Sequence, residues 1–307
     1  WCRGGRDGAV CFWDVDRARL LAACEAHKSP VTSVDWNQLQ GTLVLAASTS
    51  ARVKLLDAKN LDYIMGVFVE HTKEVSQVRW NPNAADEFAS VAADGLLKLW
   101  DRRVEESVGT LVDPEDGLEA LVCCDWHKGQ DWVLATGDAS GRVNVWDTRN
   151  HLQPMSTRQA HRKRVSSVRF STLQPSSLLS GCHGGVVRCW DTSRGIFLVQ
   201  EHSLHTQGVV GVDWDLHNAE RVVSVSADGE FLRLSLDHMV QVFEQEIRPG
   251  VLRTWKQPGL PPRRSHFPQE DTTLSTVPRH GSHHHLPSTT SVQEALSPDW
   301  WKGQAKL

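Results

Sequence analysis

The chain has 307 residues and a formal net charge of -4 at pH 7, with 33 Lys and Arg against 37 Asp and Glu. This balance gives no electrostatic reason to expect nucleic-acid binding, and no run approaches about 18 apolar residues, so no membrane-spanning helix is expected. The seven cysteines include no CxxC pair, which favours a reducing, intracellular compartment.

The first 14 residues, WCRGGRDGAVCFWD, predict the end of one β-strand, a turn at Asp7-Gly8 and a second strand that ends in Trp-Asp. The strand that should come first in such a unit is absent, so we expect the chain to be truncated at its N-terminus. The Trp-Asp ending, or a variant of it, returns at residues 57, 101, 147, 191 and 235, at intervals of 43, 44, 46, 44 and 44 residues.

Five fuller units follow the fragment, at about 24–67, 68–112, 113–157, 158–201 and 202–247. Each begins with a short strand such as VTSVDW at 31–36, in which alternation places Val34 and Trp36 on one face and Ser33 and Asp35 on the other. Three further strands follow. Four short strands at this period are typical of WD40 repeats, each of which forms a blade of a β-propeller. We therefore predict an all-β WD40 propeller over residues 1–247.

The composition changes after residue 247. Eight of the 13 prolines lie in 241–307, together with Ser/Thr clusters and the tract RHGSHHHLPSTT. Such segments bury too little apolar surface to fold, so we predict a low-complexity, mostly disordered tail over 248–307. Whether HMVQVFEQEI at 238–247 supplies the outer strand of the last blade stays open. Without 241–307 the chain keeps 25 Lys and Arg against 31 Asp and Glu, and these mildly acidic blades favour a basic partner.

Polar residues recur at fixed places in the units and predict a structural role. In WD40 blades a loop His, a Ser or Thr, a turn Asp and a Trp form a buried hydrogen-bonded chain, because buried polar groups must be paired. Only one unit offers all four: His71, Ser90, Asp94 and Trp100. The other units lack one or more members. The unit 202–247 has His205, Ser224 and Asp228 but Leu234 in place of the Trp, and the unit 158–201 has His161, Ser180 and Trp190 but Gly184 in place of the Asp. In 113–157 the His and Asp are replaced by Gly117 and Ser140, and in 24–67 the Asp and Trp are replaced by Ser50 and Leu56.

No catalytic or phosphate-binding motif is present, since GxSxG, HExxH and Gly-Lys-Ser loops are all absent. The repeat explains the scattered His, Asp and Ser residues, so we expect no enzymatic activity and no cofactor. The tract His283, His284, His285 has the chemistry to chelate a transition metal, but an incidental histidine run in a linker is the simpler interpretation. We predict no functional metal site.

Several segments carry a more particular resemblance. They are, in chain order, HKSPVTSVDW, HTKEVSQVRWNP, EFASVAADGLLKLWD, LVCCDW, WDTRNHLQP and HRKRVSSVRFS, within residues 7–237. Together they resemble the receptors for the type 2 peroxisomal targeting signal, the peroxin-seven family. LVCCDW, in a unit without the loop His, and WDTRNHLQP are the most particular pieces. The six unit ends match the last six of that family, which implies a seven-bladed propeller that lacks its N-terminal one and a half blades.

The resemblance implies a cytosolic receptor that binds an N-terminal signal of Arg/Lys, Leu/Val/Ile, five residues, His/Gln and Leu/Ala. It also implies a co-receptor and docking proteins as partners, delivery to the peroxisome, and neither nucleic-acid binding nor a membrane span. A basic, amphipathic helical signal needs carboxylates and an apolar groove, which the loops of a propeller face can supply. The carboxylates expected nearest that face are Glu74, Glu115, Asp116 and Glu119.

Two other functions fit parts of the sequence. Trp100-Asp101-Arg102-Arg103 and Trp146-Asp147-Thr148-Arg149 match W-D-x-R, which resembles the box of WD40 substrate adaptors of cullin-type ubiquitin ligases; in many blades this Arg only pairs with a neighbouring loop. Histone-binding WD40 proteins share the turn that follows the Trp-Asp pair. An adaptor and a histone-binding scaffold are therefore the alternatives to the receptor.

Overall fold

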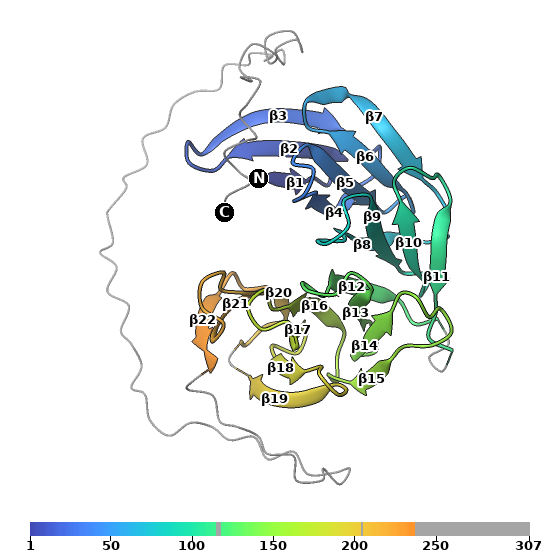
Figure 1. Ribbon diagram of the computed structural model, residues 1–307. Coiled ribbons are helices and arrows are strands. Elements are labelled where there is room, and N and C mark those ends of the chain that lie inside the picture. The colour runs from blue at the N-terminus through green and yellow to red at the C-terminus, as the bar shows by residue number, and fades with distance from the viewer. Residues whose placement is uncertain (115–117, 204, 237–307) are drawn as a thin grey trace, which may run out of the picture.

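The computed structural model describes residues 1–114, 118–203 and 205–236, and within them the helix and strand elements are all β-strands. The predicted tail at 248–307 and the possible outer strand at 238–247 lie outside these residues. The strands form six antiparallel sheets, which follow one another around an arc (Figure 1).

The first three sheets comprise β1 (Cys2–Gly4), β2 (Ala9–Asp14) and β3 (Arg19–Glu25); β4 (Val31–Trp36), β5 (Leu43–Ser48), β6 (Val53–Asp57) and β7 (Asn60–Phe68); and β8 (Val75–Trp80), β9 (Glu87–Ala92), β10 (Leu97–Asp101) and β11 (Ser107–Leu111). The last three comprise β12 (Leu121–Trp126), β13 (Val133–Asp138), β14 (Arg142–Asp147) and β15 (Ser156–Gln159); β16 (Val165–Phe170), β17 (Ser177–Cys182), β18 (Val187–Asp191) and β19 (Phe197–His202); and β20 (Val209–Trp214), β21 (Arg221–Ser226) and β22 (Phe231–Ser235).

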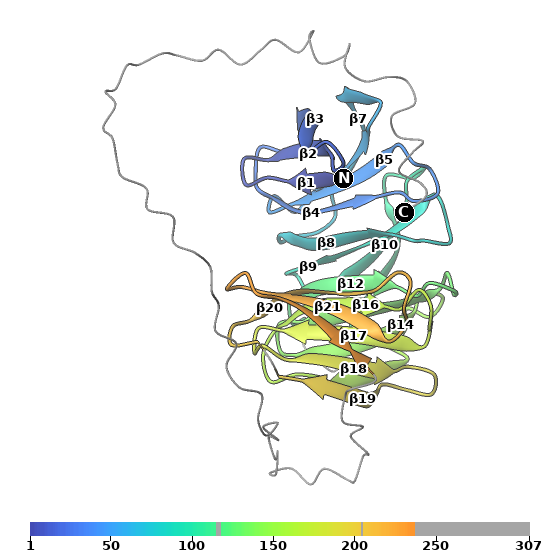
Figure 2. The same cartoon turned by 90° about the vertical axis from the view of Figure 1, so that its left-hand side faces the viewer.

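The inner strands β4, β8, β12, β16 and β20 contact one another in chain order. Figure 2 shows β4, β8 and β12 one above another, and in Figure 1 the strands β7, β11, β15 and β19 lie on the outside. Apolar side chains fill the space between sheets, as where Phe12 of β2 meets Trp36 of β4 edge to face at 5.7 Å. The predicted all-β propeller architecture is confirmed.

The predicted alternation holds in the second half of each inner strand. In β4, Val34 and Trp36 pack toward the preceding sheet, whereas Ser33 and Asp35 accept hydrogen bonds from backbone amides of β8. The register of all five inner strands shifts between their first and third residues. This β-bulge breaks strict alternation near the start of each strand, and the second residues all line one hollow at the axis: Thr32, Ser76, Val122, Ser166 and Val210.

Adjacent sheets also meet at their turns. The turn between the second and third strands contains a glycine with positive φ, between 80° and 98°, at Gly8, Gly95, Gly141 and Gly185. A Cβ at any of them would collide with the backbone of the loop that enters the next inner strand; at Gly95 it would lie 2.6 Å from the carbonyl carbon of Leu118. Only glycine combines this conformation with this contact. The second sheet has Ala51 at the same place, with φ of 62°.

These turns predict opposite effects for reciprocal substitutions. Gly95→Ala should lower the free energy of unfolding by about 1–3 kcal/mol, because it adds both strain and a backbone collision. Ala51→Gly should raise it by about 0.5–1 kcal/mol, because relief of the left-handed strain exceeds the extra entropy of an unfolded glycine. Both values are measurable by urea unfolding.

Gly129→Ala is the matched control, since a Cβ there meets only a His127 ring at 3.7 Å, and it should change stability by no more than about 0.5 kcal/mol. Destabilisation by Ala51→Gly, or an unaltered Gly95→Ala protein, would contradict the role assigned to the turns.

Candidate functional site

Each sheet exposes two sets of loops at its opposite edges. Because neighbouring strands are antiparallel, the loop that enters an inner strand lies at the same edge as the turn between the second and third strands. In the third sheet this edge holds His71, in the loop 69–74, and Asp94, in the turn 93–96. We call the side of the arc that carries these loops and turns the His-loop face. Loops such as 81–86 and 102–106 lie on the opposite face.

The four polar residues of the 68–112 blade form one chain of hydrogen bonds. The indole of Trp100 donates to Ser90 Oγ at 2.8 Å, Ser90 Oγ lies 2.7 Å from His71 Nε2, and His71 Nδ1 lies 2.9 Å from Asp94 Oδ2. A Ser hydroxyl that donates to Nε2 places the ring proton on Nδ1, facing the carboxylate. Asp94 also accepts from the amide of Thr72. This tetrad fixes a blade and leaves no group free for chemistry.

The other blades keep only parts of this chain. His161 contacts Ser180 at 2.7 Å, and Trp190 donates to the same hydroxyl. Burial first, and then the nearby charge of Arg188, lower the pKa of His161 to about 3, so its ring stays neutral near neutral pH. Gly184, in the turn, contributes no carboxylate.

In the last blade the expected turn Asp is not the partner of the loop His. His205 Nδ1 lies 3.2 Å from Glu230 Oε2. Asp228 instead accepts hydrogen bonds from Ser226 and from the hydroxyl of Thr206. The assignment of Asp228 to the chain was therefore wrong: its carboxylate is taken by the residues of its own turn and by the loop hydroxyl, and Glu230 reaches the ring.

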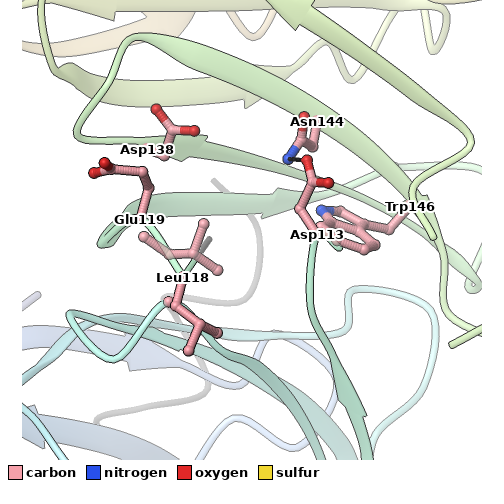
Figure 3. Close-up of a pocket in the computed structure, with 8 residues that line it drawn as sticks. Asp113, Leu118, Glu119, Asp138, Asn144 and Trp146 are labelled. Atoms are coloured by element: carbon pink, nitrogen blue, oxygen red, sulfur yellow. Dashed lines mark hydrogen bonds between the residues drawn. The ribbon is translucent and has the colours of Figure 1, made fainter. Parts of the chain in front are cut away.

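The 113–157 blade, which lacks the loop His, has a small hollow on the His-loop face (Figure 3). Thr136 takes the place of Ser90 and accepts from Trp146 at 2.9 Å. Asn144 Nδ2 donates to Asp113 at 3.2 Å, while the buried Oδ1 of Asn144 has no hydrogen-bond partner among the described residues. Ser140, expected in the Asp place, donates to Asp138, which also lines the hollow. The space is that of about one water molecule.

Two of the four predicted cargo-binding carboxylates are described, and both are exposed on the His-loop face. Glu119 lines the small hollow beside Leu118, and Glu74 lines a separate hollow at the axis. Neither side chain is engaged in a hydrogen bond or ion pair within the described residues. The structure places them on loops of neighbouring blades but not in one pocket. Glu115 and Asp116 lie outside the described residues.

The hollow at the axis has a volume of about 380 Å³. Its lining is mostly polar and carries charge of both signs, from Glu74 and Arg164, with His183 beside them. The repeat pattern gave no sign of this basic side, because Arg162, Lys163 and Arg164 are not among the polar positions that recur from blade to blade.

The two W-D-x-R arginines lie on the opposite face. Arg103 contacts Asp101 at 2.5 Å, and Arg149 contacts Asp147 at 2.7 Å. The guanidinium of Arg149 also lies 4.4 Å from the ring centre of Trp132. These contacts are the local pairing expected of a structural Arg, although both side chains remain more than 60% exposed.

The described residues contain no cluster of three or more His, Cys, Asp or Glu side chains arranged to hold a metal ion. His283, His284 and His285 are outside them. The described residues likewise contain no helix with the length and hydrophobicity to cross a membrane.

Comparison with protein families gives a match to the model described as WD domain, G-beta repeat, over residues 63–101, 106–147 and 152–191. Each matched repeat starts near the outer strand of one sheet and ends with the third strand of the next. One sequence repeat therefore ties two sheets together.

Several curated proteins are similar to the chain. The histone-binding protein MSI1 of Saccharomyces cerevisiae is 29% identical over 227 residues, which cover 70% of this chain and 52% of that protein. The protein transport protein SEC31 of Kluyveromyces lactis is 27% identical over 207 residues, 63% of this chain and 17% of that protein. Sec31A of Homo sapiens is 24% identical over 237 residues, which cover 74% of this chain and 19% of that protein. The chain thus spans about half or less of the length of these relatives.

Among solved structures, a chain of a mitotic checkpoint complex crystal structure superposes with a TM-score of 0.67 at 20% identity. The match covers 76% of this chain and 71% of that one. At this identity the likeness concerns the fold alone.

The tetrad makes a pH-dependent contribution to stability. Burial by itself would raise the pKa of Asp94, but hydrogen bonds from His71 and from the amides of Thr72 and Leu96 hold it below its ordinary value. Asp94→Asn should lower the free energy of unfolding by about 1–3 kcal/mol at pH 7, because it removes a charged acceptor. A carboxylate with a lowered pKa stabilises the fold above its unfolded pKa of about 4 and loses that contribution as the pH falls through the folded value.

The stability difference between the native protein and Asp94→Asn should therefore shrink on acidification below about pH 4, as measured by urea unfolding at several pH values. Asp16→Asn, at an exposed position, is the control and should have little effect at any pH. A difference that grew on acidification would contradict the proposed charge state of Asp94.

Proposed function

We propose that this chain, a WD40-repeat protein and therefore a protein-binding scaffold, is a receptor for N-terminal type 2 peroxisomal targeting signals. The observation that carries the proposal is a pair of exposed carboxylates, Glu74 and Glu119, which lie on neighbouring loops of the His-loop face and make no hydrogen bond or ion pair within the described residues. Some other carboxylates of the blades, such as Glu70, are occupied by internal contacts. Free carboxylates are what a basic signal requires.

The shape of the signal suits this face. In a helix, residues one and eight of the signal lie on one side, about 10 Å apart along the axis. Such a helix presents Arg or Lys together with apolar residues. Beside the two carboxylates the face exposes Leu118, which is 54% exposed, and Val210, which is 58% exposed. Apolar contacts from these side chains and ion pairs from the carboxylates would hold the same helix.

The two most particular segments of the family resemblance, LVCCDW and WDTRNHLQP, both belong to the 113–157 blade. LVCCDW is β12, the inner strand of the blade without a loop His, where the hollow beside Glu119 lies. WDTRNHLQP begins at the end of β14 and continues along the opposite face. The blade that carries the most particular pieces of the resemblance is therefore the blade that lacks the loop His and has the hollow beside Glu119.

The proposal assigns recognition followed by handover, with no chemical step. The receptor would take cargo in the cytosol and, with a co-receptor, pass it to docking proteins at the peroxisome. Relatives named as protein transport proteins are compatible with such a role.

Histone binding is a second candidate, favoured by the similarity to MSI1 over 70% of this chain. A histone helix rich in Lys and Arg would also meet Glu74 and Glu119. The two functions differ in what competes for the face: a histone binder responds to a histone helix and ignores the peroxisomal signal.

The receptor function predicts capture of a reporter that carries an N-terminal R-L-x5-H-L signal, measured by pull-down with the full chain and co-receptor. Glu74→Lys and Glu119→Lys should each weaken capture by about three- to tenfold and reduce its salt dependence, because each removes an attractive charge and adds a repulsive one. Glu105→Lys, an exposed carboxylate on the opposite face, should leave capture unchanged.

Equal capture after Arg→Glu substitution in the signal, or no capture with co-receptor present, would overturn the receptor function. Binding of a histone helix without binding of the signal would establish the second candidate. If Glu105→Lys weakened capture as strongly as Glu74→Lys does, the signal would not bind specifically on the His-loop face.

A further inference from the structure

The loop that enters β16 carries three consecutive basic residues, Arg162, Lys163 and Arg164. All three are exposed on the His-loop face, and within the described chain none makes an ion pair. Several other basic side chains near strand ends pair with a carboxylate, as Arg103 does with Asp101 and Arg149 does with Asp147. An uncompensated group of three positive charges in a protein with a net charge of -4 is unusual.

The missing counter-charge has a structural origin. In the 68–112 blade the turn residue Asp94 accepts a hydrogen bond from the amide of Thr72, in the loop. The equivalent turn residue beside the basic loop is Gly184, where a Cβ would lie 3.7 Å from Cδ of Lys163. The carboxylate of an aspartate at this position would therefore lie close to the basic side chains of the loop. Its replacement by glycine leaves the positive charge of the loop available.

The backbone of the basic loop is held at both ends. The amide of His161 donates to the carbonyl of Gly141 in the preceding blade at 2.8 Å, and the amide of His183 donates to the carbonyl of Arg164 at 3.0 Å. A loop fixed in this way presents its side chains with little ordering cost when a partner binds.

Arg164 extends this charge to the hollow at the axis. It lines the hollow with His183 and Ser76. Burial, and next the charges of Arg164 and Lys163, lower the pKa of His183, as a local positive potential requires. The hollow therefore offers cationic and hydroxyl groups close together, which suit carboxylates and backbone carbonyls.

We infer that the Arg162–Arg164 loop and the adjoining hollow bind an acidic peptide segment of a second protein. This subsite is defined by the basic loop and does not depend on the proposed function, although Glu74 lies in the same hollow. A peptide fits better than a nucleic acid, because three cations in one loop fall short of the extended basic stripe that nucleic-acid binding uses. The His-loop face would thus hold a basic and an acidic segment side by side.

Fluorescence anisotropy with the full chain and a labelled peptide of six glutamates tests the inference. Saturable, salt-sensitive binding is expected, and Arg162→Glu/Arg164→Glu should weaken it by about tenfold or more. Arg103→Glu/Arg149→Glu is the matched control: it reverses two exposed arginines on the opposite face and changes the net charge equally. It should change the affinity by less than about twofold.

The milder variant Arg162→Gln/Arg164→Gln should give an intermediate loss of affinity for the six-glutamate peptide. If the charge-reversed variant does not fold, this milder variant tests the subsite in its place. Equal weakening by both charge-reversed pairs, or equal binding of a six-glutamine peptide, would overturn the subsite. Tighter binding of a single-stranded oligonucleotide of about 20 nucleotides through the same arginines would overturn the assignment of a peptide partner.

Discussion

The contact between one blade's turn and the next blade's loop is the constraint on which the rest of the structure depends. A turn glycine with positive φ, as at Gly141 and Gly185, lies directly against the carbonyl of the following loop His. The sequence repeat crosses from one sheet to the next, so strand pairing and this contact act together. Loops that would otherwise be free to move are fixed relative to one another, and the charges they carry become a defined surface.

Because sheet packing and these turns hold the blades, the buried polar chain can be lost without loss of the fold. Thr136 and Trp146 stay paired in the blade that has no loop His. His161 and Ser180 stay paired in the blade that has no turn Asp. Each loss leaves something exposed: a hollow beside Glu119 in one blade, and an uncompensated basic loop in the other. The departures from the repeat, and not the repeat itself, generate the surface chemistry of the His-loop face.

Much of the fold could be predicted from the sequence, because the 44-residue period and the Trp-Asp endings depend on local chemistry. The chain of His71, Ser90, Asp94 and Trp100 follows from the same register. What could not be predicted depends on geometry between elements. The bulge at Thr32 turns a residue toward the axis against the alternating pattern, and Glu230 reaches His205 where Asp228 was expected. The basic loop at 162–164 was hidden by a net charge that averages over the whole chain.

The central claim is that the His-loop face recognises the basic signal through the loops that carry Glu74 and Glu119. Hydrogen exchange measured by mass spectrometry, on the full chain with and without an R-L-x5-H-L peptide, tests it most directly. The account predicts slower exchange in the amides of 69–75 and 118–122 when the peptide is bound, with 81–86 and 102–106 unchanged. Protection confined to the loops of the opposite face, or no protection at a saturating peptide concentration, would contradict it.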